Sequence, residues 1–252
     1  MTTIAVMQPT FLPWIGYFDL IDRVDRFVYL DTVEFSKQSW QQRNRIKTAN
    51  GPMWLSLPVQ ASKTEHTTVA DATVGPVDAV RKWRATLAQA YAKAAAVELE
   101  LGWIDTWLAD LEPGRSLAAT NIDFIERACE RLGIDTPRVR ASALGDADDR
   151  IERLVALCRE LDADTYLSPP GAANYLRDGV AAFRAAGVAL MFQAYEHPTY
   201  PQGHGAFQSH ASVIDLLLNT GSAAGSILRS GRRAAIPASA FLATLTDDDD
   251  GG

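Results

Sequence analysis

The chain lacks any long apolar run, and this absence excludes a membrane-spanning helix. No stretch of the sequence approaches the roughly 18 consecutive apolar residues that such a helix needs. The start of the chain also has no basic region followed by a long apolar stretch, so no secretory signal peptide is expected. We therefore expect a cytoplasmic protein.

Cysteine is scarce, and positive charge does not exceed negative charge. The two cysteines, Cys129 and Cys158, lie in sequence with helical periodicity, which predicts buried, reduced thiols. The 24 Lys and Arg residues are outnumbered by 31 Asp and Glu residues, giving a net charge of −7. This balance argues against nonspecific nucleic-acid binding through a broad basic surface, although it leaves room for a local basic patch.

Short apolar runs alternate with amphipathic runs, which predicts an α/β fold with a Rossmann-like parallel sheet. Strands that alternate with helices of about 10–15 residues build βαβ units, and these place parallel strands side by side. A mostly helical insertion, Pro76–Gly133, interrupts this alternation. The predicted strands of the sheet are Ile4–Met7, Phe27–Leu30, Arg138–Ala141, Thr165–Leu167 and Val188–Gln193.

Composition divides the chain into four segments. Residues 1–75 and 134–230 are predicted to be the two halves of the Rossmann-like domain, and 76–133 the helical insertion between them. The last segment, 231–252, is rich in Ala and Arg and ends in DDDDGG, so it is expected to be a disordered tail.

Three local predictions complete this outline. The pair Asn50-Gly51 predicts a β-hairpin, because these residues favour the tight turn that joins two antiparallel strands. Residues 60–75 are polar and are expected to form a mobile loop. Residues 174–186 are expected to form one continuous helix.

The first candidate site is the loop Gln8–Tyr17, between the first strand and the first helix. A strand followed by Pro-Thr, a glycine and a helix start offers backbone N–H groups to an anion. The loop resembles that of the nucleotidylyltransferase and pantothenate-synthetase type of fold, in which a His-x-Gly-His motif opens the helix. Here the matching residues are Trp14-Ile15-Gly16-Tyr17, so both histidines are absent. The alternative is a helix start that only packs.

The second candidate site combines a strand-end carboxylate with a basic strand. Asp31 follows the second predicted strand, where it could orient an amine or hydroxyl. Arg43, Arg45 and Lys47 alternate, so in a strand they share one face, and Asn44 faces the other way. Three cations within five residues favour recognition of phosphate or carboxylate, and nearby Trp40 adds a stacking surface. The alternative is an edge strand that its basic residues keep soluble.

The third candidate site lies between residues 195 and 215. Three of the four histidines are found here, and their spacing does not match a standard zinc motif. His197 follows a predicted strand in a proline-fixed turn, which suits a general acid or base. The alternative is a histidine that only bonds to backbone. Asp215 lies in an apolar helix and would need a partner if it is buried.

Several segments, in the same order along the chain, resemble the WbqC-like family. They are QPTFLPWIGYFDLI, FVYLDTVEFSKQSWQQRNRIKT, NGPMWLSLPV, YLSPPGAANYL and HPTYPQGHGAFQSHASVIDLLLNTG. The resemblance implies a bacterial cytoplasmic protein that is often encoded with genes for surface-polysaccharide or natural-product biosynthesis. The positions it carries over include Gln8, Gly16, Tyr17, Asp31, Trp40, Arg43, Asn44, Lys47, His197, Tyr200, Gln202, Asp215 and Asn219.

These patterns lead to a biosynthetic transferase or ligase that moves an acyl, aminoacyl or nucleotidyl group to an amine or hydroxyl. ATP or an activated acyl donor is the candidate cofactor, a small molecule is the expected partner, and aminoacyl-tRNA is a less favoured donor. The alternatives are a non-catalytic binding or scaffold protein derived from a nucleotidyl-transfer fold, and a metal-dependent hydrolase that uses the C-terminal histidines. No metal ligand is assigned.

We expect all site residues to meet in one pocket at the carboxyl edge of the sheet. His197 would be the acid or base, Asp31 would orient the nucleophile, and Arg43 and Lys47 would bind the anionic part of the donor. The predicted catalytic residues are His197, Asp31 and Tyr17, and the predicted substrate-binding residues are Gln8, Arg43, Asn44, Lys47, Tyr200, Gln202 and Asp215.

Overall fold

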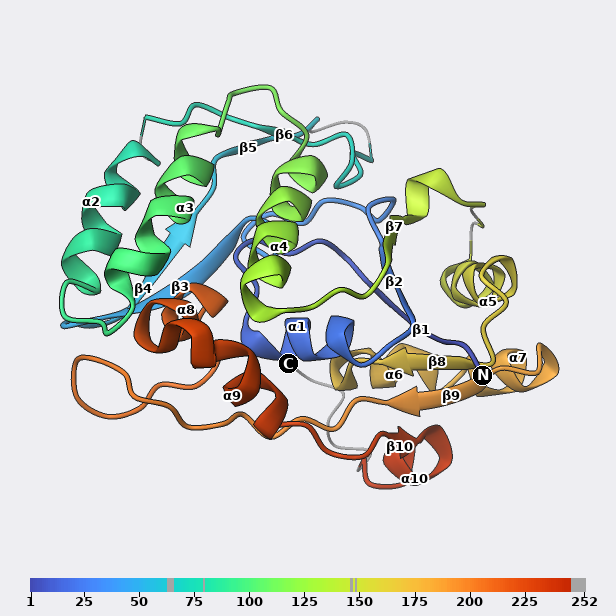
Figure 1. Ribbon diagram of the computed structural model, residues 1–252. Helices are drawn as coiled ribbons and strands as arrows, with labels where there is room; N and C mark the ends of the chain where they lie inside the picture. Colours follow the sequence, from blue (N-terminus) through green and yellow to red (C-terminus); the bar gives the residue numbers. More distant parts are fainter. Residues whose placement is uncertain (63–65, 79, 146, 148, 246–252) are drawn as a thin grey trace.

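A six-stranded sheet forms the centre of the computed structural model, which describes residues 1–62, 66–78, 80–145, 147 and 149–245 (Figure 1). The strand order is β10-β9-β8-β1-β2-β7, with β10 antiparallel to β9 and the other neighbouring pairs parallel. All five predicted strands are present, which confirms a Rossmann-like α/β fold. The strands are β1 (Thr3–Met7), β2 (Arg26–Tyr29), β7 (Arg138–Arg140), β8 (Thr165–Ser168), β9 (Ala189–Phe192) and β10 (Ile236–Pro237).

Helices cover both faces of this sheet, because the side chains of each strand alternate between two apolar cores (Figure 1). Ala5 of β1 belongs to one core, whereas Ile4 and Val6 belong to the other. The first core packs α1 (Ile15–Asp22), α4 (Leu117–Leu132), α8 (Val213–Thr220) and α9 (Ala224–Ser230). The second packs α5 (Arg150–Glu160), α6 (Ala173–Leu176), α7 (Val180–Ala185) and α10 (Ala238–Leu242).

The predicted hairpin is formed by β3 (Arg43–Thr48) and β4 (Gly51–Ser56), with Thr48 opposite Gly51. Gly51 has a φ of 96°, a backbone conformation that glycine adopts without strain. The hairpin lies away from the central sheet, beside α2 (Arg81–Ala90), α3 (Val97–Ala109) and α8 (Figure 1). The helices α2, α3 and α4 follow one another between β2 and β7 in the sequence.

Two local expectations are corrected by the structure. The helix predicted over 174–186 is broken into α6 and α7, and Gly179 stands just before α7, where a Cβ atom would lie 2.6 Å from the side chain of Ile151. In the segment 60–75, β5 (Val59–Gln60) pairs with β6 (Thr73–Val74), and Val69 and Ala72 are fully buried. The described part of this segment is therefore packed, and residues 63–65 lie outside the described residues.

The predicted disordered tail is also wrong for residues 231–245. Ile236 pairs with Phe192 of β9, and the ring of Phe241 in α10 stacks on Phe192 with centroids 4.4 Å apart. These few apolar side chains extend the second core beyond what the Ala- and Arg-rich composition suggested. Residues 246–252 lie outside the described residues.

Cys129 and Cys158 are buried and free, as predicted. Burial raises the pKa of both thiols to about 12. Within the part of the chain that the structure describes, no helix has the length and apolar character to cross a membrane. The division of the chain at residues 75, 133 and 230 stays a prediction.

A buried carboxylate fastens the first helix to the C-terminal segment. Asp19 of α1 is fully buried and accepts hydrogen bonds from Gln193 Nε2 at 2.8 Å and Arg232 Nε at 2.8 Å. Arg23 Nη1 lies 3.4 Å from the same carboxylate. Arg232 also pairs with Asp22. These contacts hold α1 against the chain that follows β9 and α9.

We expect Asp19→Ala to lower the free energy of unfolding by about 3 kcal/mol, because the substitution leaves Arg23 and Arg232 without their buried counter-charge. Urea denaturation measures this loss. Asp78→Ala is the control, since Asp78 is 88% exposed and its ion pair with Arg81 spans 3.8 Å; it should change the stability by less than about 0.5 kcal/mol. Equal effects of the two substitutions would contradict the role of Asp19.

Candidate functional site

Four of the predicted site residues form one hydrogen-bonded group around Asp215 of α8, which is 1% exposed. Its Oδ2 accepts from Tyr200 Oη at 2.8 Å and from Gln202 Nε2 at 2.6 Å, and its Oδ1 accepts from Tyr91 Oη at 2.8 Å. Gln202 Oε1 in turn accepts from Lys47 Nζ at 3.2 Å. The amide of Gln202 therefore connects a buried cation to a buried carboxylate, and we call these five residues the Asp215 group.

The surroundings of Asp215 suit a carboxylate. Burial raises its pKa, whereas the three donated hydrogen bonds and the charge of Lys47 act in the opposite direction. Burial and the neighbouring carboxylate raise the pKa of Tyr91 and Tyr200, so both hydroxyls remain protonated donors. Three donors directed at one side chain are best satisfied by an ionised carboxylate, which only accepts.

Lys47 and His204 fasten the loop between β9 and α8. Besides Gln202, Lys47 Nζ donates to the carbonyl oxygens of Gly205 at 3.5 Å and Ala206 at 2.6 Å. His204 Nε2 lies 2.7 Å from the carbonyl oxygen of Ala90, at the end of α2. His204 has a φ of 63°, in the left-handed region that only a few non-glycine residues adopt. Tertiary contacts thus hold this loop in a conformation that its sequence does not favour.

A pocket of about 300 Å³ opens beside the Asp215 group. Its size is at the lower end of the range of small-molecule sites. Polar side chains of the pocket come from β3, α2 and the turn after it, the loop between β9 and α8, and α8. The lining residues are Lys47, Gln89, Ala90, Tyr91, Ala92, Lys93, Ala94, Gly203, His204, Asp215 and Asn219.

His197 lies next to this group and has a buried ring nitrogen without a partner. Its Nδ1 is 2.9 Å from the carbonyl oxygen of Pro198, which can only accept, so we assign the proton to Nδ1. Nε2 is buried and makes no hydrogen bond. Burial lowers the pKa of the ring, which favours the neutral form with a lone pair on Nε2. Neighbouring rings surround His197, and they are Trp14, Tyr200, Phe207 and His210.

Gly16 explains the position of Trp14 in this aromatic group. A Cβ atom on Gly16 would lie 2.1 Å from the ring of Trp14, so the indole rests directly on the glycine backbone. The backbone just before α1 packs against the start of α8. Trp14 forms an antiparallel β-bridge with Ser212, and Val213 N donates to the carbonyl oxygen of Pro13. These contacts favour the packing alternative for this loop over an anion site.

Gln8, Tyr17 and Asn44 form a second, separate group, which fixes the loop after β1. Tyr17 Oη donates to the backbone oxygen of Gln8 at 3.2 Å, and Gln8 Oε1 accepts from Gln41 Nε2 at 2.7 Å. Asn44 Nδ2 donates to the backbone oxygen of Leu12 at 2.8 Å. The hydroxyl of Tyr17 is buried, and this burial raises its pKa. Each of these contacts holds backbone or a neighbouring amide in place.

Asp31 belongs to a third group. It is fully buried, and its two oxygens accept from the backbone N of Ser142 at 2.9 Å and from Ser142 Oγ at 2.7 Å. Asp31 thereby joins the end of β2 to the turn after β7. The predicted site residues thus lie in three separate places, with His197 beside the first, and Arg43 lies apart from them with its guanidinium 4.6 Å from the ring centroid of Trp54.

Sequence reasoning missed Tyr91 and Trp14 as members of the site. Tyr91 continues the apolar stripe of a predicted helix, so it looked like an ordinary core residue. Trp14 occupies the position of a histidine in the related loop, and its contact with His197 depends on a long-range approach of two loops. Only the tertiary structure shows that Tyr91 bonds to Asp215 and that Trp14 contacts His197.

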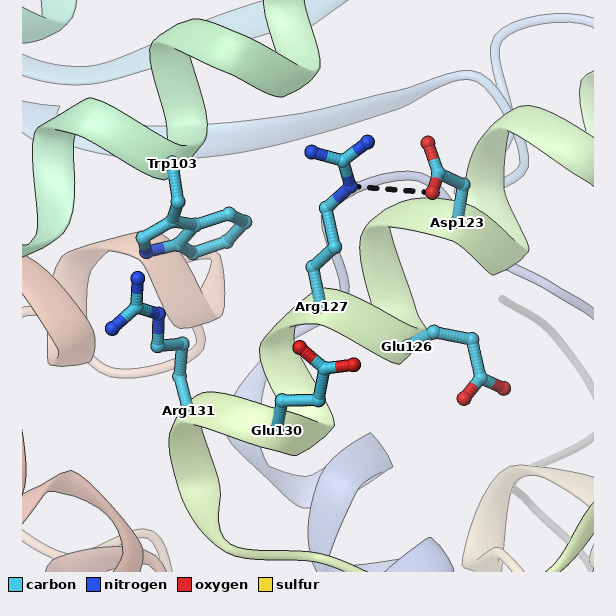
Figure 2. Close-up of a pocket in the computed structure, with 6 residues that line it drawn as sticks. All are labelled: Trp103, Asp123, Glu126, Arg127, Glu130 and Arg131. Carbon is cyan, nitrogen blue, oxygen red and sulfur yellow. Dashed lines mark hydrogen bonds and ion pairs between the residues drawn. The ribbon is translucent and has the colours of Figure 1, made fainter.

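A larger depression of about 560 Å³ lies on the outer side of α3 and α4 (Figure 2). Its charged side chains pair with one another or with neighbours: Arg127 contacts Asp123 and Asp110, and Glu126 contacts Arg138. Because four of its five charged side chains already have partners, we assign the site to the smaller pocket beside Asp215.

No three His, Cys, Asp or Glu residues of the described part lie close enough together to hold a metal ion. The three histidines predicted for the hydrolase alternative are placed differently. His197 and His210 lie near each other with centroids 5.1 Å apart, whereas His204 turns to Ala90. The ligand set of a metal-dependent hydrolase is therefore missing from these residues.

Comparison with known proteins places this arrangement in a family. The family model described as WbqC-like protein family matches residues 8–227, which include the whole Asp215 group and His197. The chain belongs to the WbqC-like family. It is also similar to a protein of Mycobacterium tuberculosis (strain ATCC 25618 / H37Rv) named "Uncharacterized protein Rv1507c", with 34% identity over 238 residues, covering 92% of this chain and 100% of that protein. No solved structure matches this WbqC-like chain.

The assigned state of His197 can be measured directly. We expect the ring to titrate below 6.5, with the proton on Nδ1, because burial disfavours the charged form. Nitrogen-15 NMR of the histidine rings measures both the pKa of His197 and the nitrogen that carries its proton. The signals are assigned with the spectrum of His197→Gln. The folded state then binds fewer protons than the unfolded state, so His197 should reduce stability as the pH falls below 6.5. A titration at or above this value would contradict the assignment.

Removal of one hydroxyl tests the Asp215 group. Tyr91→Phe should lower the free energy of unfolding by about 1.5–3 kcal/mol, because a buried carboxylate loses one of its three donors. Thermal and urea denaturation measure this change. Tyr175→Phe is the matched control, since the hydroxyl of Tyr175 forms no hydrogen bond within the described residues and its ring contact with Arg150 is retained. An unchanged stability in Tyr91→Phe would argue against a closely coupled group.

Proposed function

We propose that this WbqC-like protein is a biosynthetic transferase or ligase, which transfers an acyl, aminoacyl or nucleotidyl group to an amine or hydroxyl. The observation that supports this proposal most directly is the unpartnered Nε2 of His197, buried in an aromatic group that includes Tyr200 of the Asp215 group. A buried polar atom without a partner is costly, so it is usually retained for a purpose. A neutral imidazole with a free lone pair suits general base catalysis.

In this reaction the nucleophile of the acceptor gives its proton to His197 Nε2. The nucleophile forms a bond to the carbonyl carbon or the phosphorus of the donor, and the bond to the leaving group breaks with its electron pair. The leaving group then takes up the proton, which returns the histidine to its neutral state. The Nδ1 hydrogen bond to Pro198 keeps the ring orientation fixed throughout.

The Asp215 group acts in this proposal by positioning. Tyr200 joins it to His197, because the Tyr200 hydroxyl bonds to Asp215 while its ring lies 6.2 Å from the imidazole centroid. Lys47 is bound to three acceptors of the loop, so it orders the loop that carries the site. The proposed role of Lys47 is therefore loop anchoring, and donor binding by its ammonium group would require these bonds to open.

Family membership supports the biosynthetic part of this proposal, since the family resemblance implies genes for surface-polysaccharide or natural-product synthesis. We also propose that the protein is located in the cytoplasm. The second candidate is a binding or scaffold protein. It is favoured by Trp14 and Tyr17, which stand where the related nucleotidyl-transferring loop has two histidines.

A donor screen followed by single-residue variants tests the enzyme proposal. A donor from the set of ATP, coenzyme A thioester and aminoacyl-tRNA, at about 100-fold excess over its Kd, should add about 2.7 kcal/mol to the free energy of unfolding. With that donor and an amine or hydroxyl acceptor, His197→Ala should reduce turnover by about 10²–10⁴-fold. His66→Ala is the control, because the side chain of His66 is 93% exposed and its contact among the described residues is with Glu34.

Two outcomes would contradict the enzyme proposal. Full turnover in His197→Ala would remove the histidine from the mechanism. Binding of a donor without turnover by any acceptor would favour the binding or scaffold protein instead.

A further inference from the structure

The outer face of the β3–β4 hairpin carries two exposed tryptophans. Trp54 is 45% exposed and Trp40 is 49% exposed, and their ring centroids lie 5.5 Å apart. Trp54 stands opposite Arg45 in the hairpin, so both side chains point to the same face, together with Arg43. The other face, with Asn44 and Leu55, is buried. We call Trp40, Arg43, Arg45 and Trp54 the Trp–Arg face.

Two adjacent exposed indole rings are informative, because contiguous apolar patches on a protein surface often mark binding sites. Large apolar side chains that are exposed among the described residues are few, and Trp40 and Trp54 are the two aromatic ones. They are adjacent, so they form one continuous surface instead of two scattered contacts. Paired indole rings are a suitable surface for a planar ring to stack on.

The two arginines of this face have no acidic partner in the part of the chain that the structure describes. Arg43 lies with its guanidinium 4.6 Å from the ring centroid of Trp54 and forms no side-chain ion pair there. The Nε of Arg45 is buried and makes no hydrogen bond. This is unexpected in a chain with 31 acidic and 24 basic residues. An anionic oxygen would satisfy this guanidinium.

Arg45 of the Trp–Arg face lies near the aromatic group around His197. The backbone N of Ser212 donates to the backbone oxygen of Arg45 at 2.9 Å, and the ring of His210, two residues earlier, lies 4.7 Å from Trp14 and 5.1 Å from His197. Burial and then the charge of Arg45 lower the pKa of His210, so Arg45 acts on this ring. Arg45 is therefore close to a ring that packs against the proposed base.

We propose that the Trp–Arg face binds a nucleoside phosphate, with the base stacked on Trp40 and Trp54 and the phosphate paired with Arg45 and Arg43. A neutral sugar would stack on the indoles but would leave the arginines unused. An acidic peptide would pair with the arginines but has no planar ring in fixed relation to its charge. A nucleoside phosphate provides both features in one small ligand. This inference rests on the proposed function in one respect, since it makes this ligand part of the group donor.

Tryptophan fluorescence of the full chain at low salt tests the proposal, with ATP, AMP and adenosine as probes and correction for nucleotide absorbance. We expect saturable quenching by ATP and AMP, and weaker binding of adenosine. Arg45→Gln should weaken ATP binding by about 10- to 100-fold, the size of one lost charge-assisted hydrogen bond, and leave adenosine binding nearly unchanged. Trp54→Leu should weaken the binding of all three probes.

The controls separate this inference from the enzyme proposal. Arg81→Gln replaces an arginine of α2 that is 78% exposed and does not belong to the Trp–Arg face. It should leave the affinities for ATP, AMP and adenosine unchanged. His197→Gln should bind ATP with unchanged affinity, because the base does not belong to the Trp–Arg face. Nucleotide binding with normal turnover in His197→Gln would overturn the enzyme proposal alone. Turnover that depends on His197 without nucleotide binding would overturn this inference alone.

The source of the nucleoside phosphate is decided by one further probe, a short RNA that ends in CCA. If this RNA binds at least about tenfold tighter than ATP, the ligand is the end of an RNA, and otherwise it is a free nucleotide. Circular dichroism confirms that each variant is folded. Two results would overturn the inference. One is the absence of saturable binding of any nucleotide or of the RNA. The other is an affinity for ATP in Arg45→Gln and in Trp54→Leu that equals the affinity of the unchanged chain.

Discussion

The bridge from Lys47 through Gln202 to Asp215 is the interaction on which the rest of the site depends. It joins three parts of the chain, since Lys47 lies in the hairpin, Gln202 in the loop before α8 and Asp215 in α8 itself. Burial of a cation and an anion is unfavourable unless each is paired and hydrogen-bonded. Here the amide satisfies both, and the loop that carries His197 receives a defined position as a result.

The same loop combines order with strain. His204 and His210 have φ values of 63° and 59°, a conformation that non-glycine residues seldom adopt. Such residues persist only where surrounding contacts hold them. In this protein the contacts are the bonds of Lys47 to the loop carbonyls and the bond between His204 and Ala90. The same loop carries His197, whose Nε2 is closed to solvent.

Much of the fold was predictable from local patterns. The alternation of apolar and amphipathic runs predicted the five parallel strands, and Asn50-Gly51 predicted the hairpin. A turn centred on Asn50-Gly51 would place Trp54 opposite Lys47, whereas the observed turn residues are Ala49 and Asn50 and Trp54 lies opposite Arg45, so this part of the Trp–Arg face could not be derived from sequence. The strand β10 could not be derived either, because its two residues gain their order from pairing with β9 and not from their own pattern.

The sequence by itself determined which residue types were available: a histidine in a proline-fixed turn, a basic strand, and a carboxylate in an apolar helix that required partners. Tertiary structure decided which of them meet. In the folded chain Asp215 accepts from the hydroxyls of Tyr91 and Tyr200. Asp31 accepts from Ser142, and the amide of Asn44 donates to a backbone oxygen. The physical reason is that a buried polar group must find its partner in three dimensions, and partners more than a hundred residues apart, such as Tyr91 and Asp215, leave no periodic signal in the sequence.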